Sequence, residues 1–346
     1  MADDEDIARA AGDAVTIYEV AARAGVSIAT VSHALNRPER VSAGTLQRVL
    51  DTASELGFVP RGRGRATPAL RRIVVSGPFS QHETYLARLV GVLGAAQGID
   101  VVVVDDPKPG DPVIDRLQVR GAVDGAIIMG AEPSLELAHE LEAQGVAVVL
   151  LDRPSQQFAS VAVNDEAGGS ILADHVMDVG AASIAVVSPP PASSDFVTNG
   201  ELRLRAFVSR LRERGFTGDV PWTVCDDSLD GGRTAAAELV ASGVLPEAVF
   251  ALHDIIAAGV LAGLREAGVD VPGQVRVVGY DDIDLAGVMG LTTVRQPFAR
   301  SGEVAVEALR TLRASRNLPV AHITLLPELV TRSTSPAMGA DQKEPR

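Results

Sequence analysis

The feature that most constrains the fold of this 346-residue chain is an alternation, from residue 73 onward, of short apolar runs with longer amphipathic stretches. Eight runs recur at nearly constant spacing: Ile73–Val75, Val101–Val104, Ala126–Met129, Val146–Leu151, Ile184–Val187, Thr223–Cys225, Val249–Leu252 and Val275–Val278. Glycines closely precede several of them, as expected where a helix ends before a buried strand. The pattern predicts strand–helix units that form parallel sheets covered by helices on both faces, in two doubly wound lobes.

Polar residues follow most of these runs, at the point where each predicted strand ends. They are Ser76, Asp105, Asp106, Asp152, Arg153, Ser188, Asp226, Asp227, His253, Asp254, Asp281 and Asp282. Each one alone is better explained as a helix cap or a turn residue. Ligands of doubly wound sheets bind at the carboxyl ends of the strands, so the whole set predicts a polar-ligand site between the lobes.

Composition narrows the class of protein. The apolar runs are far shorter than the roughly 20 residues that a membrane-spanning helix needs. A single cysteine, Cys225, excludes an intramolecular disulfide framework and a multi-cysteine zinc site. The first residues are acidic, whereas a secretory signal peptide begins with basic residues. We therefore expect a cytoplasmic protein with no cofactor and no metal site.

The charge of −14 is unevenly distributed along the chain. Residues 15–72 carry nine arginines and four acidic residues, a net charge of +5, so the acidic excess lies outside this segment. Such asymmetry predicts that one end of the chain binds a polyanion. Chance drift of surface charge would also produce it, so the motifs of the basic segment have to decide.

Three short helices are predicted within the basic segment. Thr16 and Glu19 form a capping box for the first, and Ser27 caps a second over about Ile28–Leu35. The third, Ser42–Leu56, has an apolar stripe of Leu46, Val49, Leu50, Ala53 and Leu56. A tight glycine-containing turn between the first two helices is typical of a helix-turn-helix unit, whose commonest use is to read DNA.

Residues 16–60 resemble, almost without gaps, the DNA-binding head of the lactose-repressor (LacI/GalR) family. The segments that carry the resemblance are Thr16–Ser27, Thr30–Asn36, Val41–Thr45 and Leu56–Pro60. The resemblance implies that three side chains face base edges in the major groove, namely Ile28, Ala29 and His33. For the histidine, a solvated surface position is the alternative. The resemblance also implies contacts to the DNA backbone by Thr16, Ser27, Thr30, Ser32, Asn36 and Thr45.

Residues 61–72 depart from the family pattern, in which a short hinge helix inserts a leucine into the minor groove. Two glycines and Pro68 disfavour a helix here. Thr67 stands at the leucine position, with Leu70 three residues later. The sequence favours a basic arm that contacts the DNA backbone through Arg61, Arg63 and Arg65. A hinge helix and a plain flexible linker stay open as alternatives.

The acidic part resembles the effector-binding core of the same family, which is itself similar to periplasmic sugar-binding proteins. The segments that carry this second resemblance are Leu151–Pro154, Val163–Gly168, Val277–Asp282, Leu291–Pro297 and Leu326–Thr334, together with Arg203 and Phe207. It implies a small polar effector held between the lobes by Ser76, Tyr85, Asp152, Arg203, Asp227, Asp254, Asp281 and Gln296.

Two positions of that core depart from the family. Asp227 stands where many members have an aromatic ring, and His253 stands where many have asparagine. An acidic pocket with little aromatic surface predicts a polyol, a neutral sugar or a cationic ligand rather than a purine.

We therefore predict an all-helical helix-turn-helix head joined to a two-lobed, doubly wound α/β (periplasmic-binding-protein-like) effector domain. The expected parts are a disordered acidic tail (1–14), the head (15–60), a hinge (61–72), the effector domain (73–337) and a disordered tail (338–346). Lobe 1 should comprise about 73–163 and 295–322, and lobe 2 about 164–291 and 323–337.

The expected function is transcription regulation, by default repression, by a homodimer that binds a pseudo-palindromic DNA operator with an affinity set by a sugar-like effector. No leucine-heptad extension supports a tetramer. One alternative is a cytoplasmic sugar-binding sensor of the same fold that does not read DNA. Another is an enzyme, but the chain lacks the common phosphate-loop, dinucleotide and nucleophile-elbow motifs, and we predict no catalytic residues.

Overall fold

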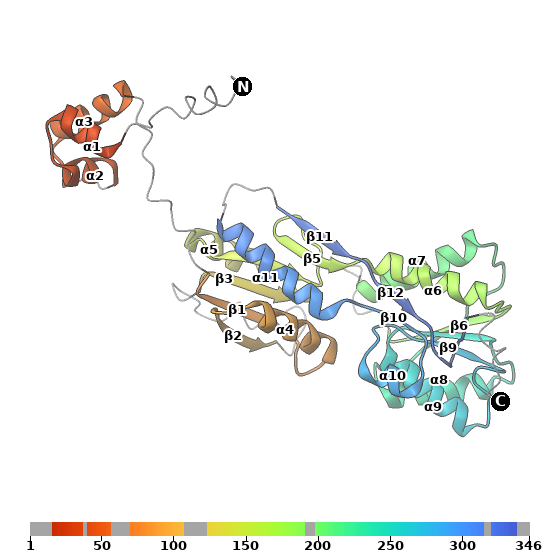
Figure 1. Cartoon of the computed structure of the whole chain (residues 1–346). Helices are drawn as coiled ribbons and strands as arrows, with labels where there is room; N and C mark the ends of the chain where they lie inside the picture. Colours follow the sequence, from red (N-terminus) through yellow and green to blue (C-terminus); the bar gives the residue numbers. More distant parts are fainter. Residues whose placement is uncertain are drawn as a thin grey trace, which may run out of the picture. The chain divides into compact units, whose positions relative to one another are not determined.

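The computed structural model describes residues 16–36, 40–56, 70–106, 123–190, 198–314 and 320–337. The chain divides into two compact units, residues 1–68 and 69–346 (Figure 1). Both terminal tails, 1–14 and 338–346, lie outside the described residues. So does most of the linker, including Arg61, Arg63, Arg65 and Thr67, and the expectations of a basic arm or a hinge helix therefore stay predictions.

The first unit contains the three predicted helices, α1 (Ile17–Ala24), α2 (Ile28–Asn36) and α3 (Ala43–Glu55). Their apolar faces form a small core of Val20, Ala21, Ala24, Val31, Ala34, Val49 and Ala53. The predicted stripe of α3 is wrong at Leu50, whose side chain is 43% exposed. The core between three short helices is narrow and takes in only one side of α3, that of Val49 and Ala53. Leu50 lies beside this side and stays partly exposed to solvent.

The predicted caps explain where these helices begin and end. The Glu19 carboxylate accepts hydrogen bonds from the Thr16 backbone N–H (2.6 Å) and hydroxyl (2.9 Å). Gly25 ends α1 with a left-handed φ of 66°, a conformation that glycine adopts without steric cost. The Thr30 N–H donates to the Ser27 hydroxyl at 3.1 Å, so Ser27 caps α2.

The first lobe of the second unit is built on a parallel sheet in the order β11-β5-β4-β3-β1-β2. Its strands are β1 (Arg72–Gly77), β2 (Asp100–Asp105), β3 (Gly125–Met129), β4 (Ala147–Leu151), β5 (Ala159–Val163) and β11 (His322–Leu325). Helices α4 (Glu83–Ala95) and α11 (Phe298–Ala314) cover one face, and α5 (Leu135–Gln144) covers the other. Within β1, Ile73 and Val75 face the first layer and Val74 faces the second.

The second lobe is built on a parallel sheet in the order β7-β6-β8-β9. Its strands are β6 (Ile184–Ser188), β7 (Trp222–Val224), β8 (Ala248–Ala251) and β9 (Arg276–Val278). Helices α6 (Asp165–Asp178) and α7 (Asn199–Glu213) cover one face. Helices α8 (Leu229–Ala241), α9 (Asp254–Glu266) and α10 (Asp284–Met289) lie on the other. The predicted class, two doubly wound α/β lobes, is confirmed.

All eight predicted strands are present, but the sequence pattern missed β5, β11 and a short antiparallel pair, β10 (Thr293–Arg295) and β12 (Glu328–Val330). This pair lies where the chain passes between the lobes (Figure 1). The expected lobe boundary also needs correction, because β11 pairs with β5 and residues 323–325 therefore belong to the first lobe. The C-terminal stretch returns to the second lobe, where Thr334 and Ser335 are buried.

No helix within the described ranges combines the length and apolar character that crossing a membrane requires.

The connecting strand β10 is attached to the second lobe by Asp254, whose side chain is fully buried at the start of α9. Its carboxylate accepts hydrogen bonds from the Thr293 hydroxyl (2.6 Å) and the Ile283 N–H (3.1 Å). Burial and the nearby Asp281 carboxylate raise the pKa of Asp254 to about 7, although these hydrogen bonds favour the charged form.

Because the pKa of Asp254 is higher in the folded chain than its ordinary value of about 4, its protonation favours folding. This contribution is fully present below that ordinary value and is lost as the pH rises through about 7. Asp254→Asn removes the titration. Between about pH 5 and pH 8, we expect the unfolding free energy of the variant to rise relative to wild type by about 1.4 kcal/mol or more, the equivalent of one pKa unit. Urea denaturation measures this difference, and parallel pH profiles would contradict the assignment.

Candidate functional site

A cavity of about 880 Å³ lies between the carboxyl ends of the two parallel sheets, where the sequence predicts a ligand site. In the first lobe it is lined by the start of α4 and by the loop after β4. In the second lobe it is lined by the loops after β6, β7, β8 and β9 and by the start of α7. Gln296, which follows β10, lines it from the connection between the lobes.

The cavity brings together six of the eight predicted effector residues, namely Tyr85, Asp152, Arg203, Asp227, Asp281 and Gln296. Ser76 and Asp254 are not among the lining residues. Ser76 is fully buried at the end of β1, where its hydroxyl donates to Asp106 at 3.3 Å. Asp254 uses its carboxylate to hold β10, as described above. Both side chains therefore make contacts within the protein and not with the cavity.

The first-lobe side of the cavity is organised by an ion pair that the sequence analysis did not identify. Arg88 of α4 is 2% exposed and its guanidinium lies 2.7 Å from the Asp152 carboxylate. The guanidinium also stacks between the rings of Tyr85 (5.2 Å to the centroid) and Phe298 (4.5 Å). The signal in the sequence was an arginine in the middle of the apolar face of α4, which is a costly position for an unpaired charge.

Asp152 also contacts the second lobe. The side-chain amide of Asn199, at the start of α7, donates to the Asp152 carboxylate (3.2 Å) and to its backbone carbonyl (3.3 Å). The backbone of Asp152 is held at φ 63°, a conformation that non-glycine residues rarely adopt and that clusters at functional sites. This residue is therefore a polar bridge between the lobes at the edge of the cavity.

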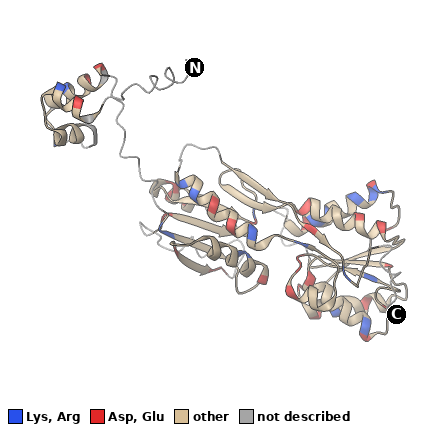
Figure 2. Cartoon of the chain, in the orientation of Figure 1, with Lys and Arg blue, Asp and Glu red and all other residues tan. Residues whose placement is uncertain are grey.

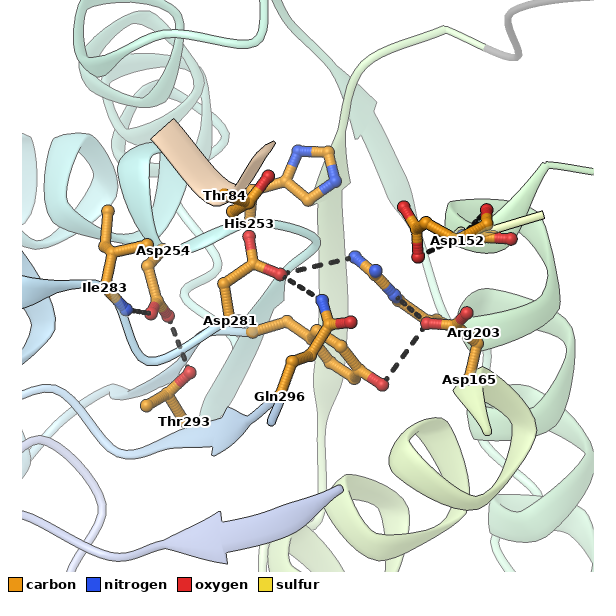
Figure 3. A network of polar contacts seen from close by, with 12 residues as sticks. Thr84, Asp152, Asp165, Arg203, His253, Asp254, Asp281, Ile283, Thr293 and Gln296 are labelled. Atoms are coloured by element: carbon orange, nitrogen blue, oxygen red, sulfur yellow. Dashed lines mark hydrogen bonds and ion pairs between the residues drawn. The ribbon is translucent and has the colours of Figure 1, made fainter. Parts of the chain in front are cut away.

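The second-lobe side is organised around Arg203, whose side chain is almost fully buried (Figure 3). Its Nε donates to Asp165 at 2.6 Å, its Nη1 lies 3.7 Å from the Asp281 carboxylate, and its guanidinium stacks 4.0 Å from the Tyr280 ring centroid. Gln296 donates to the same Asp281 oxygen at 2.6 Å. Burial opposes the charged form, but these acidic neighbours raise the pKa of Arg203, which stays a cation.

A further polar pair and an aromatic ring complete this side. His253 Nδ1 lies 2.9 Å from the Asp227 carboxylate. Trp222 of β7 lines the cavity, is 48% exposed, and donates from Nε1 to the Ser188 hydroxyl at 2.8 Å. The expectation of little aromatic surface therefore needs correction, because Trp222 and Tyr85 both line the cavity.

Among the residues that the structure describes, no group of three or more histidine, cysteine, aspartate or glutamate side chains could hold a metal ion.

The candidate DNA-reading face of the first unit is the start of α2. Ile28 (42% exposed) and Ala29 lie exposed in its first turn, and His33 lies one turn later, half-buried. The hydroxyls of Ser27 and Thr30 lie 2.8 Å apart beside them.

The other residues that are predicted to contact the DNA backbone differ in how exposed they are. Thr16 is exposed, Ser32 and Thr45 are half-buried, and the side chain of Asn36 is outside the described set. The described part of the unit has exposed arginines at positions 23, 40 and 48 and exposed acidic residues at positions 19, 51 and 55. Figure 2 shows that basic and acidic residues both occur on its helices.

The comparisons with known proteins agree with this architecture. Residues 16–61 match the family model for bacterial regulatory proteins of the lacI family, and residues 173–335 match a periplasmic binding protein-like domain. The HTH-type transcriptional regulator DegA of Bacillus subtilis is 30% identical over 341 residues, which cover 93% of this chain and 98% of DegA.

Solved structures extend the likeness to the fold. The lac repressor dimer bound to operator and the anti-inducer ONPF is similar with a TM-score of 0.66 and 26% identity, covering 94% of this chain and all of that one. A LacI family regulator from Enterococcus faecium with bound ribose gives a TM-score of 0.66 and 25% identity, covering 78% of this chain and all of that one. By its relatives and its helix-turn-helix head, the chain belongs to the LacI family of bacterial transcription regulators.

Proposed function

We propose that this regulator represses transcription as a homodimer on a pseudo-palindromic operator, and that a sugar or sugar derivative bound between its lobes sets the affinity for DNA. The observation that carries the proposal is the polar 880 Å³ cavity at the carboxyl ends of both sheets, in the same chain as a helix-turn-helix unit. The ribose found in the similar Enterococcus faecium structure supports a sugar as the class of ligand.

In this proposal Ile28 and Ala29 read the major groove by apolar contact, for example with a thymine methyl group, and His33 reads it by a hydrogen bond. Hydroxyl groups at the helix starts fix the position on the phosphates, and the neighbouring hydroxyls of Ser27 and Thr30 at the start of α2 support this role for them. Linker arginines at positions 61, 63 and 65 would add contacts along the phosphates or in the minor groove.

The dimer is supported by an unusual exposed face of the first lobe. Leu86, Val90 and Leu93 are 46%, 64% and 46% exposed and recur at helical spacing on α4. Val103, 45% exposed, lies on the sheet's edge strand β2 and points to the same side of the sheet as α4, because it is in register with Val75 of β1. Apolar side chains grouped in this way mark protein–protein contacts.

Helix α4 would connect the two functions. One of its faces carries Arg88 into the cavity, where the guanidinium pairs with Asp152 and through it reaches Asn199 of the other lobe. Another face carries the exposed leucine and valine side chains of the proposed dimer contact. A ligand that favours one arrangement of the lobes thereby favours one arrangement of the dimer, which is differential affinity for two states.

We further infer that the protein acts in the cytoplasm, where its DNA target is, and binds the effector without converting it. Incubation with candidate sugars tests the second point, since more product than protein would show catalysis. The rival function, a sugar sensor without sequence-specific DNA reading, is tested by the DNA selection that follows.

Selection of bound fragments from a random DNA pool by the purified protein should recover one pseudo-palindrome. His33→Ala should then cost about 1–3 kcal/mol of binding free energy and relax the preference at one position of each half-site, because one base contact is lost. His139→Ala, an exposed histidine of α5, serves as the control. Absence of an enriched sequence would contradict the regulator proposal, and equal loss on all sequences would remove His33 from base reading.

Val90→Asp should weaken the dimer at least about tenfold, because a charge would be buried in the contact. Sedimentation equilibrium measures the dissociation constant, and affinity for the selected DNA should fall in parallel. Val288→Asp is a matched control, since this valine of α10 is 83% exposed on the second lobe. An unchanged dimer in the Val90 variant would exclude this face.

Asp281→Asn should weaken effector binding at least about tenfold, since charge-assisted hydrogen bonds contribute about 1.5–3 kcal/mol. The measurement is titration of the protein–DNA complex with candidate sugars, beginning with D-ribose. Asp178→Asn, at an exposed carboxylate of α6, should respond as wild type does. A full response in the Asp281 variant would place the effector elsewhere.

A further inference from the structure

Asp227 and His253 form a polar pair that is separate from the ion-pair clusters around Arg88 and Arg203. It is formed by the loops after β7 and β8, and both side chains line the cavity about one-quarter exposed. His253, Asp281 and Arg203 line the same cavity and are drawn together in Figure 3. The pair is therefore at a place where a ligand in the cavity would touch it.

The hydrogen bond fixes which atoms of the pair remain available. Burial opposes ionisation of Asp227, but the hydrogen bond from His253 and the nearby Arg203 guanidinium hold the pKa of Asp227 below its ordinary value. Asp227 is thus a carboxylate, which can only accept, so the hydrogen bond of 2.9 Å requires that His253 Nδ1 carries a hydrogen and donates it. When Nδ1 carries the only ring hydrogen, Nε2 is an acceptor, and the second carboxylate oxygen of Asp227 is also an acceptor.

A third acceptor belongs to Gln296, at the connection between the lobes. Gln296 uses its amide nitrogen on Asp281, while its side-chain oxygen is buried and has no hydrogen-bond partner in the described structure. A buried acceptor without a partner is costly unless a ligand or water donates to it. The second-lobe side therefore presents two acceptor atoms, from Asp227 and His253, and the Gln296 oxygen is a buried third acceptor at the connection between the lobes.

The two buried arginines of the cavity already form ion pairs with acidic side chains of the protein. The lining residues include five carboxylates (Glu83, Asp152, Glu201, Asp227 and Asp281) and three arginines (Arg88, Arg153 and Arg203). Arg88 already pairs with Asp152, and Arg203 pairs with both Asp165 and Asp281. A phosphate or carboxylate beside Asp227 would meet like charge in a partly desolvated site.

From these contacts we propose that Asp227 and His253 determine the specificity of the effector site. They select a non-anionic polyol that brings a hydroxyl or ammonium donor to the Asp227 oxygen and His253 Nε2, and they reject phosphorylated and carboxylated sugars. This inference rests on the proposed function and narrows its ligand class.

The test uses the full-length protein and Trp222, the only tryptophan of the chain, whose fluorescence reports on the cavity it lines. The probes are D-ribose, D-glucose and D-glucosamine, with D-ribose 5-phosphate, D-glucose 6-phosphate and D-gluconate as anionic counterparts. The proteins are wild type, Asp227→Asn, His253→Gln, and the control Asp178→Asn, which alters a carboxylate outside the lining.

Wild type should bind its best neutral or amine-bearing probe at least about tenfold more tightly than the anionic counterpart, equal to about 1.4 kcal/mol. Asp227→Asn should lower this preference at least about fivefold by removing the charge, and Asp178→Asn should leave it unchanged. A stronger effect on D-glucosamine than on D-glucose would identify the donor as ammonium. Equal affinity for anionic probes, or a preference that survives in Asp227→Asn, overturns the proposal.

A second measurement tests, without any ligand, whether His253 Nδ1 donates to Asp227 and leaves Nε2 as an acceptor. In protein labelled with ¹⁵N-histidine, the resonances lost in His253→Gln identify the ring, and their couplings report which nitrogen carries the proton. We expect the Nδ1–H tautomer in wild type and its loss in Asp227→Asn. An Nε2–H ring overturns the acceptor pair. If no probe changes Trp222 fluorescence, the sugar class of the proposed function fails, while the tautomer still supports or overturns the pair.

Discussion

The neutralisation of the buried Arg203 guanidinium is the constraint on which the geometry of the cavity depends. A buried charge that loses its partner costs about 3–5 kcal/mol, so the chain has to bring carboxylates to it. Asp165 comes from the start of α6 and Asp281 from the loop after β9. Because Gln296 bonds to Asp281, the same network also reaches the connection between the lobes. The Arg203 cation thus holds together α7, the start of α6, the end of β9 and the segment after β10 around a single site.

In the first lobe, the buried Arg88 guanidinium is neutralised in the same way, by Asp152. This ion pair has a consequence for regulation. The pair is almost fully buried on its own lobe, yet Asp152 accepts a hydrogen bond from Asn199 of the other lobe. Since Arg88 lies on the helix that also exposes Val90, the cavity and the proposed dimer contact share one rigid element. A packed helix shared by two sites is one physical route by which they can be energetically coupled.

Predictions from the sequence succeeded where the signal is local and repeated. Apolar runs and glycine stops located eight strands, and side-chain caps located the helices of the head. They failed where an element is short or its partners are remote. β10 and β12 have three residues each and pair with one another across a long stretch of sequence, so neither produces a periodic pattern. Leu50 followed the spacing of a buried stripe and is exposed, because the core of three short helices is too small to cover it.

The sequence by itself determined the class of fold, the helix-turn-helix unit and the collection of polar groups at the strand ends, since each depends on neighbours within a few residues. Only the tertiary structure decided which of those groups face the cavity. Asp254 and Asp281 follow consecutive strands with similar local sequence, yet Asp254 is buried against β10 and Asp281 lines the cavity. The difference arises from segments distant in the chain, because the packing of Thr293 and Gln296 determines which carboxylate is covered and which is left for a ligand.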